Sequence, residues 1–277
     1  MDESNQPTLS TADAPLPPSY GRNAKWKFDR WWLLVLFVVA MIILLVTTSP
    51  DPYRRIVMFV KDGIGVTLMV TVSSFFLVLF AGLIGGLGRL SKNPIVSGLA
   101  SVYVEVVRGI PLLVQLLFWY FAFPSVIQSF GKTIHYQPFE NYLANPVGMA
   151  ILGLTFCYGA YMSEIYRAGI QAIPKGQMEA ARSLGMSYIQ AMRYVIIPQA
   201  ARVILPPVGN EFISLLKDSS LVSVVAVADM TRRGREFMAA NFIPIETWLM
   251  VALLYLVLTL LSARIVTWIE QKTRIER

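Results

Sequence analysis

Glu211 is the ionisable residue whose surroundings best suit ligand chemistry. It lies well inside an apolar stretch, and a lone carboxylate at bilayer depth costs roughly 2.5–3.5 kcal/mol, so it is expected to face a cavity or a partner. Pro206 and Pro207 precede it, and because they lack backbone donors they can open carbonyl groups to a water-filled space. With Asn210 and Ser214 it forms a polar lining that suits an ammonium group or a cationic side chain. The alternative is a buried ion pair with a neighbouring helix.

Two further pairs of charges are spaced three residues apart. Glu105 and Arg108 form one pair, and Glu164 and Arg167 form the other. At this spacing both members lie on one face of a helix. We interpret both pairs as structural ion pairs rather than as groups that act directly on a ligand.

The sequence gives little support for a metal site, a disulfide or a phosphate-binding loop. His135 is the single histidine and has no Cys or His at ligand spacing, so a metal site is not expected. Cys157 is the single cysteine, which excludes an intrachain disulfide. The stretch Gly131–Thr133 is similar to the end of a phosphate-binding loop, but Val126 stands where that loop needs glycine. No cofactor or ATP site is therefore expected on this chain.

The composition is typical of a membrane protein. Hydrophobic residues make up 55% of the 277 residues and charged residues 15%, and the apolar residues are gathered into long runs. The formal net charge of +7 suits the basic cytoplasmic loops of membrane proteins. Since no basic stripe with interleaved aromatics occurs, nucleic acid is not an expected partner.

The elements that position these residues are predicted to be helices, because only helices satisfy their own backbone groups in a bilayer. Six apolar stretches are long enough to cross about 30 Å of hydrocarbon: 30–49, 63–88, 98–123, 147–170, 193–216 and 245–268. The predicted fold is thus all-α, with a disordered basic tail at 1–29 and a short tail at 269–277. The first stretch is interpreted as a retained helix rather than a signal peptide, because its polar leader is long and lacks a cleavage pattern.

The charge distribution predicts that both termini are cytoplasmic. With six spans this orientation places fourteen basic residues inside and eight outside. The cluster Arg232, Arg233 and Arg235 opposes the trend. It lies in the connection 217–244, whose apolar run Leu221–Ala228 is too short to cross and predicts a re-entrant or interfacial helix.

Glycines in the second stretch predict close helix packing. Gly82 and Gly86 have the Gly-x-x-x-Gly spacing that lets helix backbones approach in membranes. The glycines around them do not form a dinucleotide-binding fingerprint, since they lie in an apolar helix.

The loop after the fourth stretch predicts a helix, a turn and a second helix. Gly176 ends the preceding helix, residues 177–184 are good helix formers, and Gly185 breaks the run. Ser187 with Gln190 has the spacing of a capping box that starts the next helix. On pattern alone, an ordinary interfacial helix is the alternative.

This loop resembles the EAA signature of ABC importer permeases. Glu179, Ala180 and Ala181 are followed at the signature spacing by Gly185 and by Val195–Pro198, where the usual Ile-x-Leu-Pro reads Val-x-Ile-Pro. In that family this helix inserts into a cleft of the nucleotide-binding subunit. The resemblance therefore implies ATPase coupling by five residues: Gly176, Glu179, Ala180, Ala181 and Gly185.

More of the chain is similar to the polar amino acid branch of these permeases. The similar runs are 103–115, 160–170 and 210–221, and the likeness covers about 63–268. That family has a core of five spans, so the stretch 30–49 is an extra helix. The resemblance also implies that the position of Glu211 can contact substrate.

The resemblance implies a transport subunit rather than an enzyme. Its expected partners are a nucleotide-binding ATPase that carries ATP and Mg, a second permease subunit of the same or a related chain, and an extracytoplasmic solute-binding protein. Its expected substrate is a polar or charged L-amino acid, and its expected location is the bacterial inner membrane. Two alternatives remain at this point: a secondary transporter driven by an ion gradient, and a membrane sensor or scaffold.

Overall fold

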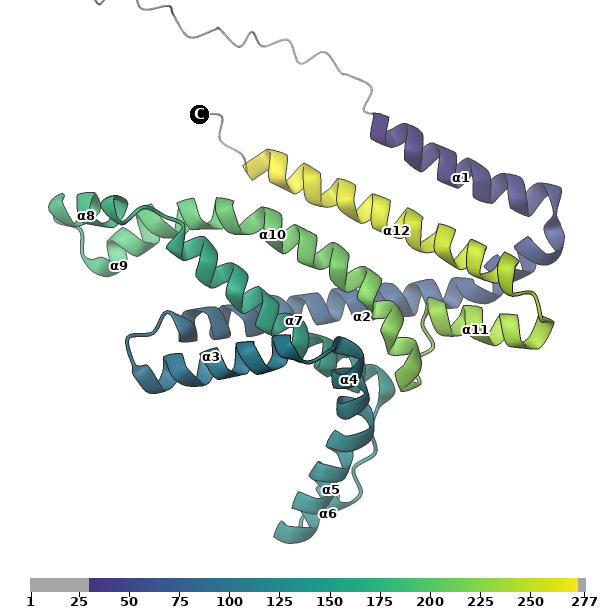
Figure 1. The fold of residues 1–277 in the computed structure, drawn as a ribbon, viewed down its shortest axis with the longest axis horizontal. Helices are drawn as coiled ribbons and strands as arrows, with labels where there is room; N and C mark the ends of the chain where they lie inside the picture. The colour runs from purple at the N-terminus through teal and green to yellow at the C-terminus, as the bar shows by residue number, and fades with distance from the viewer. Residues whose placement is uncertain (1–29, 274–277) are drawn as a thin grey trace, which may run out of the picture.

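The structure is a computed structural model that describes residues 30–273. That part of the chain is built from helices and contains no strand (Figure 1). The α-helices, in chain order, are α1 (Arg30–Thr48), α2 (Pro50–Arg89), α3 (Pro94–Gly109), α4 (Leu112–Leu117), α5 (Phe123–Ile134), α6 (Gln137–Glu140), α7 (Pro146–Gln171), α8 (Lys175–Ser183), α9 (Tyr188–Ala191), α10 (Ile197–Asp218), α11 (Met230–Asn241) and α12 (Pro244–Thr273). Two π-helical segments, Phe118–Ala122 and Met192–Ile196, and a 3-10 segment, Ser219–Val225, continue α4, α9 and α10.

The predicted all-α membrane architecture is confirmed. Within residues 30–273, five helical segments are long and apolar enough to cross a bilayer: Trp31–Thr48, Pro50–Arg89, Leu112–Ile134, Pro146–Gln171 and Pro244–Lys272. The predicted span 193–216 is also helical, but Arg202, Glu211 and two prolines make α10 less apolar, and it is not among the five. Six crossings therefore stay a prediction, and the predicted tail 1–29 lies outside the described residues.

The structure differs from the prediction at two boundaries. The stretch 49–62, expected to separate the first span from the core, kinks at Asp51 (φ −104°, ψ 112°) and is then helical into the next span as α2. Its prolines lie in the first turn, where a missing N–H costs little, and its charges lower hydropathy without breaking the helix. At the other end α12 continues to Thr273, so residues 269–273 of the predicted tail are helical.

The predicted span 98–123 is broken. Ile110 is extended between α3 and α4, with φ −104° and ψ 131°. Pro111 explains the break, because its ring disfavours a helical conformation at the preceding residue and it has no N–H to donate. Gln115, only 6% exposed, stabilises the gap: its Nε2 donates to the carbonyl oxygens of Val107 (2.8 Å) and Ile110 (2.9 Å).

α2 and α7 pack with their backbones in close contact. A Cβ added at Gly85 would lie 2.1 Å from Ser163 Oγ, and one at Gly86 would lie 2.9 Å from the Ser163 carbonyl oxygen. Gly82 faces Met162 in the same way, at 2.4 Å from Cγ. The close packing predicted from the glycine spacing is confirmed, and α7, which leads to α8, rests directly on α2.

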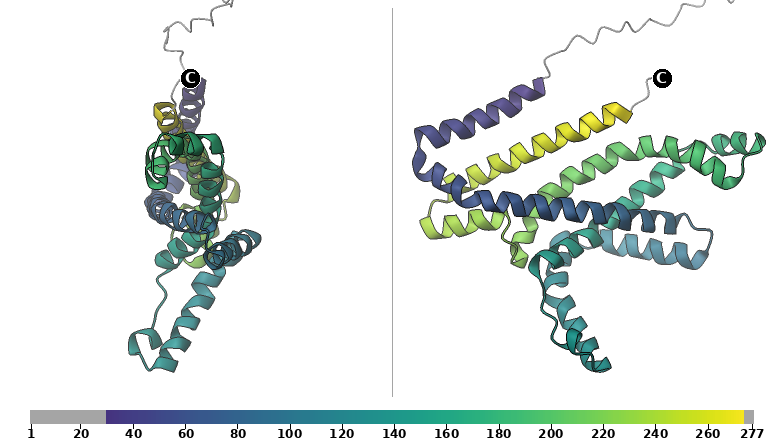
Figure 2. Two further views of the ribbon diagram at one scale, coloured as in Figure 1. Left: turned by 90° about the vertical axis from the view of Figure 1, so that its left-hand side faces the viewer. Right: turned by 180° about the vertical axis from the view of Figure 1, so that it is seen from behind.

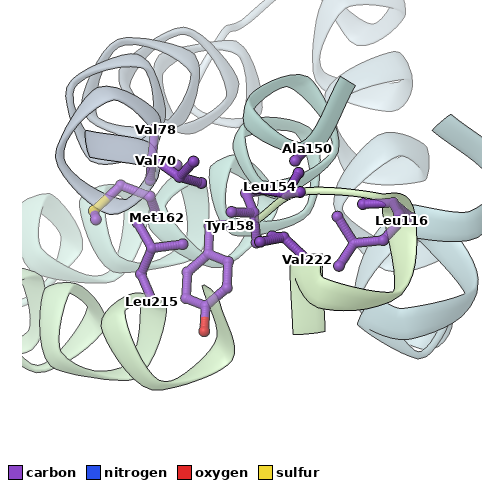
Figure 3. Packing of buried hydrophobic residues seen from close by; sticks show 11 residues of the cluster. Val70, Val78, Leu116, Ala150, Leu154, Tyr158, Met162, Leu215 and Val222 are labelled. Atoms are coloured by element: carbon purple, nitrogen blue, oxygen red, sulfur yellow. The ribbon is translucent and has the colours of Figure 1, made fainter. Parts of the chain in front are cut away.

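The main hydrophobic cluster lies where α2, α4, α7 and the end of α10 meet (Figure 3). Val70 of α2, Leu154 of α7 and Leu215 of α10 are each fully buried in it. Tyr158 lies beside Leu215, 5% exposed, so a polar hydroxyl stands at the edge of this apolar cluster. The cluster holds α10 against the α2–α7 pair.

Half of the run Leu221–Ala228 is buried, and Ala226 in it is exposed. Val222 and Val225 in its 3-10 segment are both 0% exposed and belong to the main cluster. The helix predicted in this connection is instead α11, which follows the run and packs against α2. There the backbone N–H of Met230 donates to Thr67 Oγ1 over 3.1 Å.

Asp229 joins two helices, α11 and α12, at the start of α11. Its carboxylate is 0% exposed and caps the helix by accepting the backbone N–H groups of Thr231 (3.1 Å) and Arg232 (2.9 Å). The hydroxyl of Tyr255 on α12 also donates to it, over 3.2 Å. Asp229 therefore stabilises the contact between α11 and α12.

The basic cluster on α11 is partly neutralised within the helix. Arg232 and Arg233 each form an ion pair of 3.0 Å with Glu236. These bonds lower the pKa of the Glu236 carboxyl below its usual range, and the hydrogen bond from Arg232 is the largest cause. Arg235 donates instead to Ser223 Oγ, over 3.2 Å.

The helices give the molecule two distinct ends. α8 and α9 lie at one end, and α11 lies at the opposite end beside the turn between α1 and α2 (Figures 1 and 2). α1 lies alongside α12, where Val35 and Val38 pack with Leu253 and Leu260. α5 and α6 project from the body (Figure 2). α1 thus covers α12, and its role as an addition to a core of five spans stays a prediction.

Candidate functional site

Glu211 and Ser214 lie on α10 as partly buried side chains, whereas Asn210 is exposed. Glu211 and Ser214 are three residues apart and share a helix face, and the polar lining by Asn210, Glu211 and Ser214 stays a prediction. The charged groups whose fields act on Glu211 are Asp218 and Arg108. No cation forms an ion pair with Glu211 within residues 30–273, so the structure does not support the alternative of a buried ion pair.

Asp218 and Tyr158 extend this polar face and were not identified from the sequence. The Tyr158 hydroxyl donates to Asp218 Oδ2 over 2.7 Å. Asp218 follows Glu211 by seven residues, which is two helical turns, so the two carboxylates lie on one side of α10. That spacing was the available signal. The sequence carries no comparable signal for Tyr158, because its partner Asp218 lies on another helix.

Glu164 is held between two arginines. It forms the expected ion pair with Arg167, whose Nε donates to Glu164 Oε2 over 3.0 Å, and a second ion pair with Arg89 of α2. Arg167 also donates to Gln171. The three charges lie where α7 leaves α2 and approaches α8, so they fix the end of α7 to α2.

Arg108 does not form the expected ion pair with Glu105. No ion pair joins them in the described part of the chain. The Arg108 guanidinium instead lies over the ring of Tyr161 on α7, 5.2 Å from its centroid. Its long side chain reaches the neighbouring helix, and a ring face there offers a cation–π contact. Arg108 and Glu105 both line a cavity of about 560 Å³ that also includes Glu164.

The loop after α7 has the helix–turn–helix form expected from the sequence. α8 ends in a Schellman motif: Gly185 has φ +84°, the N–H of Met186 donates to the carbonyl of Ala181 (3.2 Å), and the N–H of Gly185 donates to that of Arg182 (3.0 Å). Ser187 then caps α9, with both bonds of the capping box to Gln190 present. The turn is therefore fixed by backbone bonds.

The surface of this loop is open and partly apolar. Glu179, Ala180 and Gly176 are exposed, and Leu184 and Ile189 are 81% and 76% exposed. Large exposed apolar side chains on a charged helix hairpin are typical of a protein-binding surface.

Ala181 is the exception among the five residues assigned to coupling. Its side chain is only 4% exposed, because it faces the chain's own core. Its side chain therefore supports α8 from within.

A comparison with known families gives a match along most of the chain. Residues 78–275 match the family described as "Binding-protein-dependent transport system inner membrane component". The match includes α3, α7, the α8 loop and α10.

Curated relatives of similar length exist. The "Glutamine transport system permease protein GlnP" of Escherichia coli K12 is 37% identical over 214 residues, which cover 77% of this chain and 92% of that protein. The "Arginine transport system permease protein ArgU" of Corynebacterium glutamicum is 35% identical over 238 residues, covering 82% and 75% respectively.

Solved structures share the fold. One is a crystal structure of an amino acid ABC transporter with histidines, whose sequence is 37% identical to this chain. The two superpose with a TM-score of 0.70 over 81% of this chain and 97% of that one. A methionine ABC transporter in an inward-facing conformation, at 20% identity and a TM-score of 0.61, shows the same fold. This chain therefore belongs to the family of inner-membrane permease components of binding-protein-dependent ABC importers.

Proposed function

We propose that this chain is the permease subunit of an ABC importer for polar or charged L-amino acids, and that α8 docks a separate ATPase carrying ATP and Mg. The observation that carries the coupling role is the exposed hairpin from α8 to α9. Its turn is fixed at Gly185, and Glu179, Ala180 and Leu184 are presented at one end of the molecule.

In this proposal α8 and both termini are cytoplasmic. α11 and the turn between α1 and α2 are at the opposite end, where a solute-binding protein delivers substrate. A second permease subunit, identical or related, completes the pathway, and movement of α8 on the ATPase switches the side from which the pathway is open. The importer belongs to the bacterial inner membrane.

The substrate class rests on the carboxylates of α10 and on the relatives. Glu211 and Asp218 present negative charge on one face of α10, which suits an ammonium group or a cationic side chain. The two named relatives are transport systems for glutamine and for arginine. Both are amino acids with an ammonium group, so the chemistry of the site and the relatives agree.

The coupling role is tested by co-purification with the partner ABC ATPase. Wild-type permease retains the ATPase through affinity and gel-filtration steps, and Gly185→Asp loses it, because aspartate is strained at φ +84° and adds charge to the docking surface. Gly98→Ala in α3, where a Cβ meets nothing within 4 Å, is the matched control. Uptake in vesicles driven by a proton gradient without any ATPase contradicts the proposal and favours a secondary transporter.

The substrate role is tested with Glu211→Gln in the assembled transporter. We expect weaker uptake of labelled glutamine and arginine, with the ATPase still bound. Wild-type uptake at every substrate concentration contradicts a role for Glu211.

A further inference from the structure

Arg108 lines a cavity and forms no ion pair within residues 30–273. It is the fifteenth residue of the sixteen in α3, and at about 1.5 Å per residue it lies about 20 Å from the start of that helix. Arg108 therefore lies at the end of α3 that adjoins the apolar segment Leu112–Ile134. It lines the cavity of about 560 Å³ together with Tyr161 and Glu164.

Neither carboxylate that lines this cavity forms an ion pair with Arg108. Both oxygens of Glu164 already accept hydrogen bonds from Arg89 and Arg167. Glu105, one turn away on α3, makes no ion pair with Arg108 in the described residues. The face of Tyr161 supports the guanidinium but accepts none of its five N–H donors in the manner of an anion.

The opposite charge lies beyond Tyr161. The rings of Tyr161 and Tyr158 have their centroids 6.0 Å apart, and Tyr158 is bonded to Asp218. Arg108 and the carboxylates of α10 are thus joined by two tyrosines of α7. One end of this surface is positive and the other negative, which is the charge pattern of a zwitterion.

We propose that Arg108 binds the α-carboxylate of the transported amino acid, while Glu211 and Asp218 face its ammonium group or cationic side chain. A guanidinium is suited to a carboxylate because its parallel N–H donors bind both oxygens. Gly109 leaves room for the ligand, since a Cβ there would meet no atom within 4 Å. This inference rests on the proposed function that the chain transports amino acids.

The experiment measures binding to the purified permease–ATPase complex in nanodiscs, without solute-binding protein. Labelled L-arginine and L-glutamine are the probes, and L-argininamide and L-glutaminamide, which lack the carboxylate charge, are the competitors. Wild type is expected to bind each acid roughly 10- to 100-fold more tightly than its amide, the range of a lost charge-assisted hydrogen bond. Equal binding of acid and amide overturns the proposal without any variant.

Variants then locate the carboxylate site. Arg108→Gln is expected to lose most of the preference for the acid by binding the acid less tightly, and Arg108→Lys to restore part of it. Arg264→Gln is the matched control, because Arg264 also lies over an aromatic ring, that of Trp32 at 5.8 Å, but between α12 and α1. It is expected to keep the wild-type preference.

Each contrary result has a distinct meaning. If Arg108→Gln keeps the wild-type preference, the carboxylate is bound elsewhere and the proposal fails. If the variant binds acid and amide more tightly, Arg108 is a counter-ion that competes with substrate, and the proposal also fails. If wild type binds no amino acid of a complete panel, the proposed function itself fails, and the proposal fails with it.

Discussion

The hydroxyl of Tyr158 donates a hydrogen bond to the carboxylate of Asp218, over 2.7 Å. The bond joins the middle of α7 to the last residue of α10, helices that lie on the two sides of the α8 loop in the chain. A displacement of α7 therefore acts directly on the end of α10, two turns beyond Glu211.

Tyr158→Phe tests this connection. The substitution removes the hydroxyl donor and leaves the Asp218 carboxylate without this hydrogen bond, at an expected cost of about 1–3 kcal/mol of folding free energy. Thermal unfolding of the permease in nanodiscs measures the loss. Tyr136→Phe, at a residue 49% exposed, is the control, and an equal effect of both variants contradicts a specific role for the bond.

Glu164→Gln tests the junction of α2 and α7. Glu164, Arg89 and Arg167 have side chains only 16% to 27% exposed, so losing the charge is expected to destabilise by about 1–3 kcal/mol, between the values for exposed and buried pairs. Asp51→Asn is the control, because its ion pair with Arg55 is largely exposed and is worth about 0–1 kcal/mol. Denaturant unfolding compares the two, and equal losses argue against the junction.

Gly86→Ala tests the close packing of α2 on α7. Its Cβ would lie 2.9 Å from the backbone carbonyl oxygen of Ser163, so the helices must separate, at a cost of about 1–3 kcal/mol. Gly65→Ala in the same helix meets nothing within 4 Å and is expected to be neutral or to stabilise by up to about 1 kcal/mol. A Gly86→Ala protein as stable as the wild type would show that α7 is not fixed at this point.

Gly185→Ala tests whether the turn of the α8 loop must be rigid. Alanine at φ +84° is strained by about 1–2 kcal/mol, which favours opening of the turn without adding charge. We expect slower substrate-stimulated ATP hydrolysis by the assembled transporter. Gly185→Asn, which tolerates this conformation better, is expected to retain more activity than the alanine variant. The reverse order of the two variants contradicts the explanation.

Glu236 predicts a pH dependence. Because the folded-state pKa of Glu236 is lowered, mainly by the hydrogen bond from Arg232, its contribution to stability is complete above the ordinary carboxyl pKa and is lost as pH falls through the lowered value. Unfolding measured from neutral to acid pH is expected to separate wild type from Glu236→Gln at neutral pH and to bring them together in acid. A constant difference across this range contradicts the prediction.

Hydropathy and helix signals predicted the parts of the fold that depend on one segment alone. α7 begins and ends within one residue of the predicted span, and α12 begins at Pro244, one residue before its predicted span, because long apolar runs define such helices. The turn at Gly185 and the capping box at Ser187 were likewise predicted, since both depend on local chemistry. These features need no information from other helices.

The features that were missed depend on contacts between segments. Arg89, the partner of Glu164 on α2, is 75 positions away, so spacing within α7 predicted only the Arg167 half of that ion-pair cluster. Arg108 lies on Tyr161 of another helix, so spacing within α3 predicted the wrong partner, Glu105. The break at Ile110 has a local signal in the sequence, Pro111, but the apolar residues on both sides led to the prediction of one continuous span. Hydropathy averaged over a span cannot register one extended residue.

The glycine contacts of α2 have a mechanical consequence. From Ile56 to Arg89 this helix is about 50 Å long, and its glycines fix it to α7, the element that leads to the α8 loop. A tilt of about 10° around the middle of such a rod displaces each of its ends by about 4 Å. A small rotation imposed at one end of α2 thus moves its other end, and it also acts on α11, because the backbone N–H of Met230 donates to Thr67 of this helix.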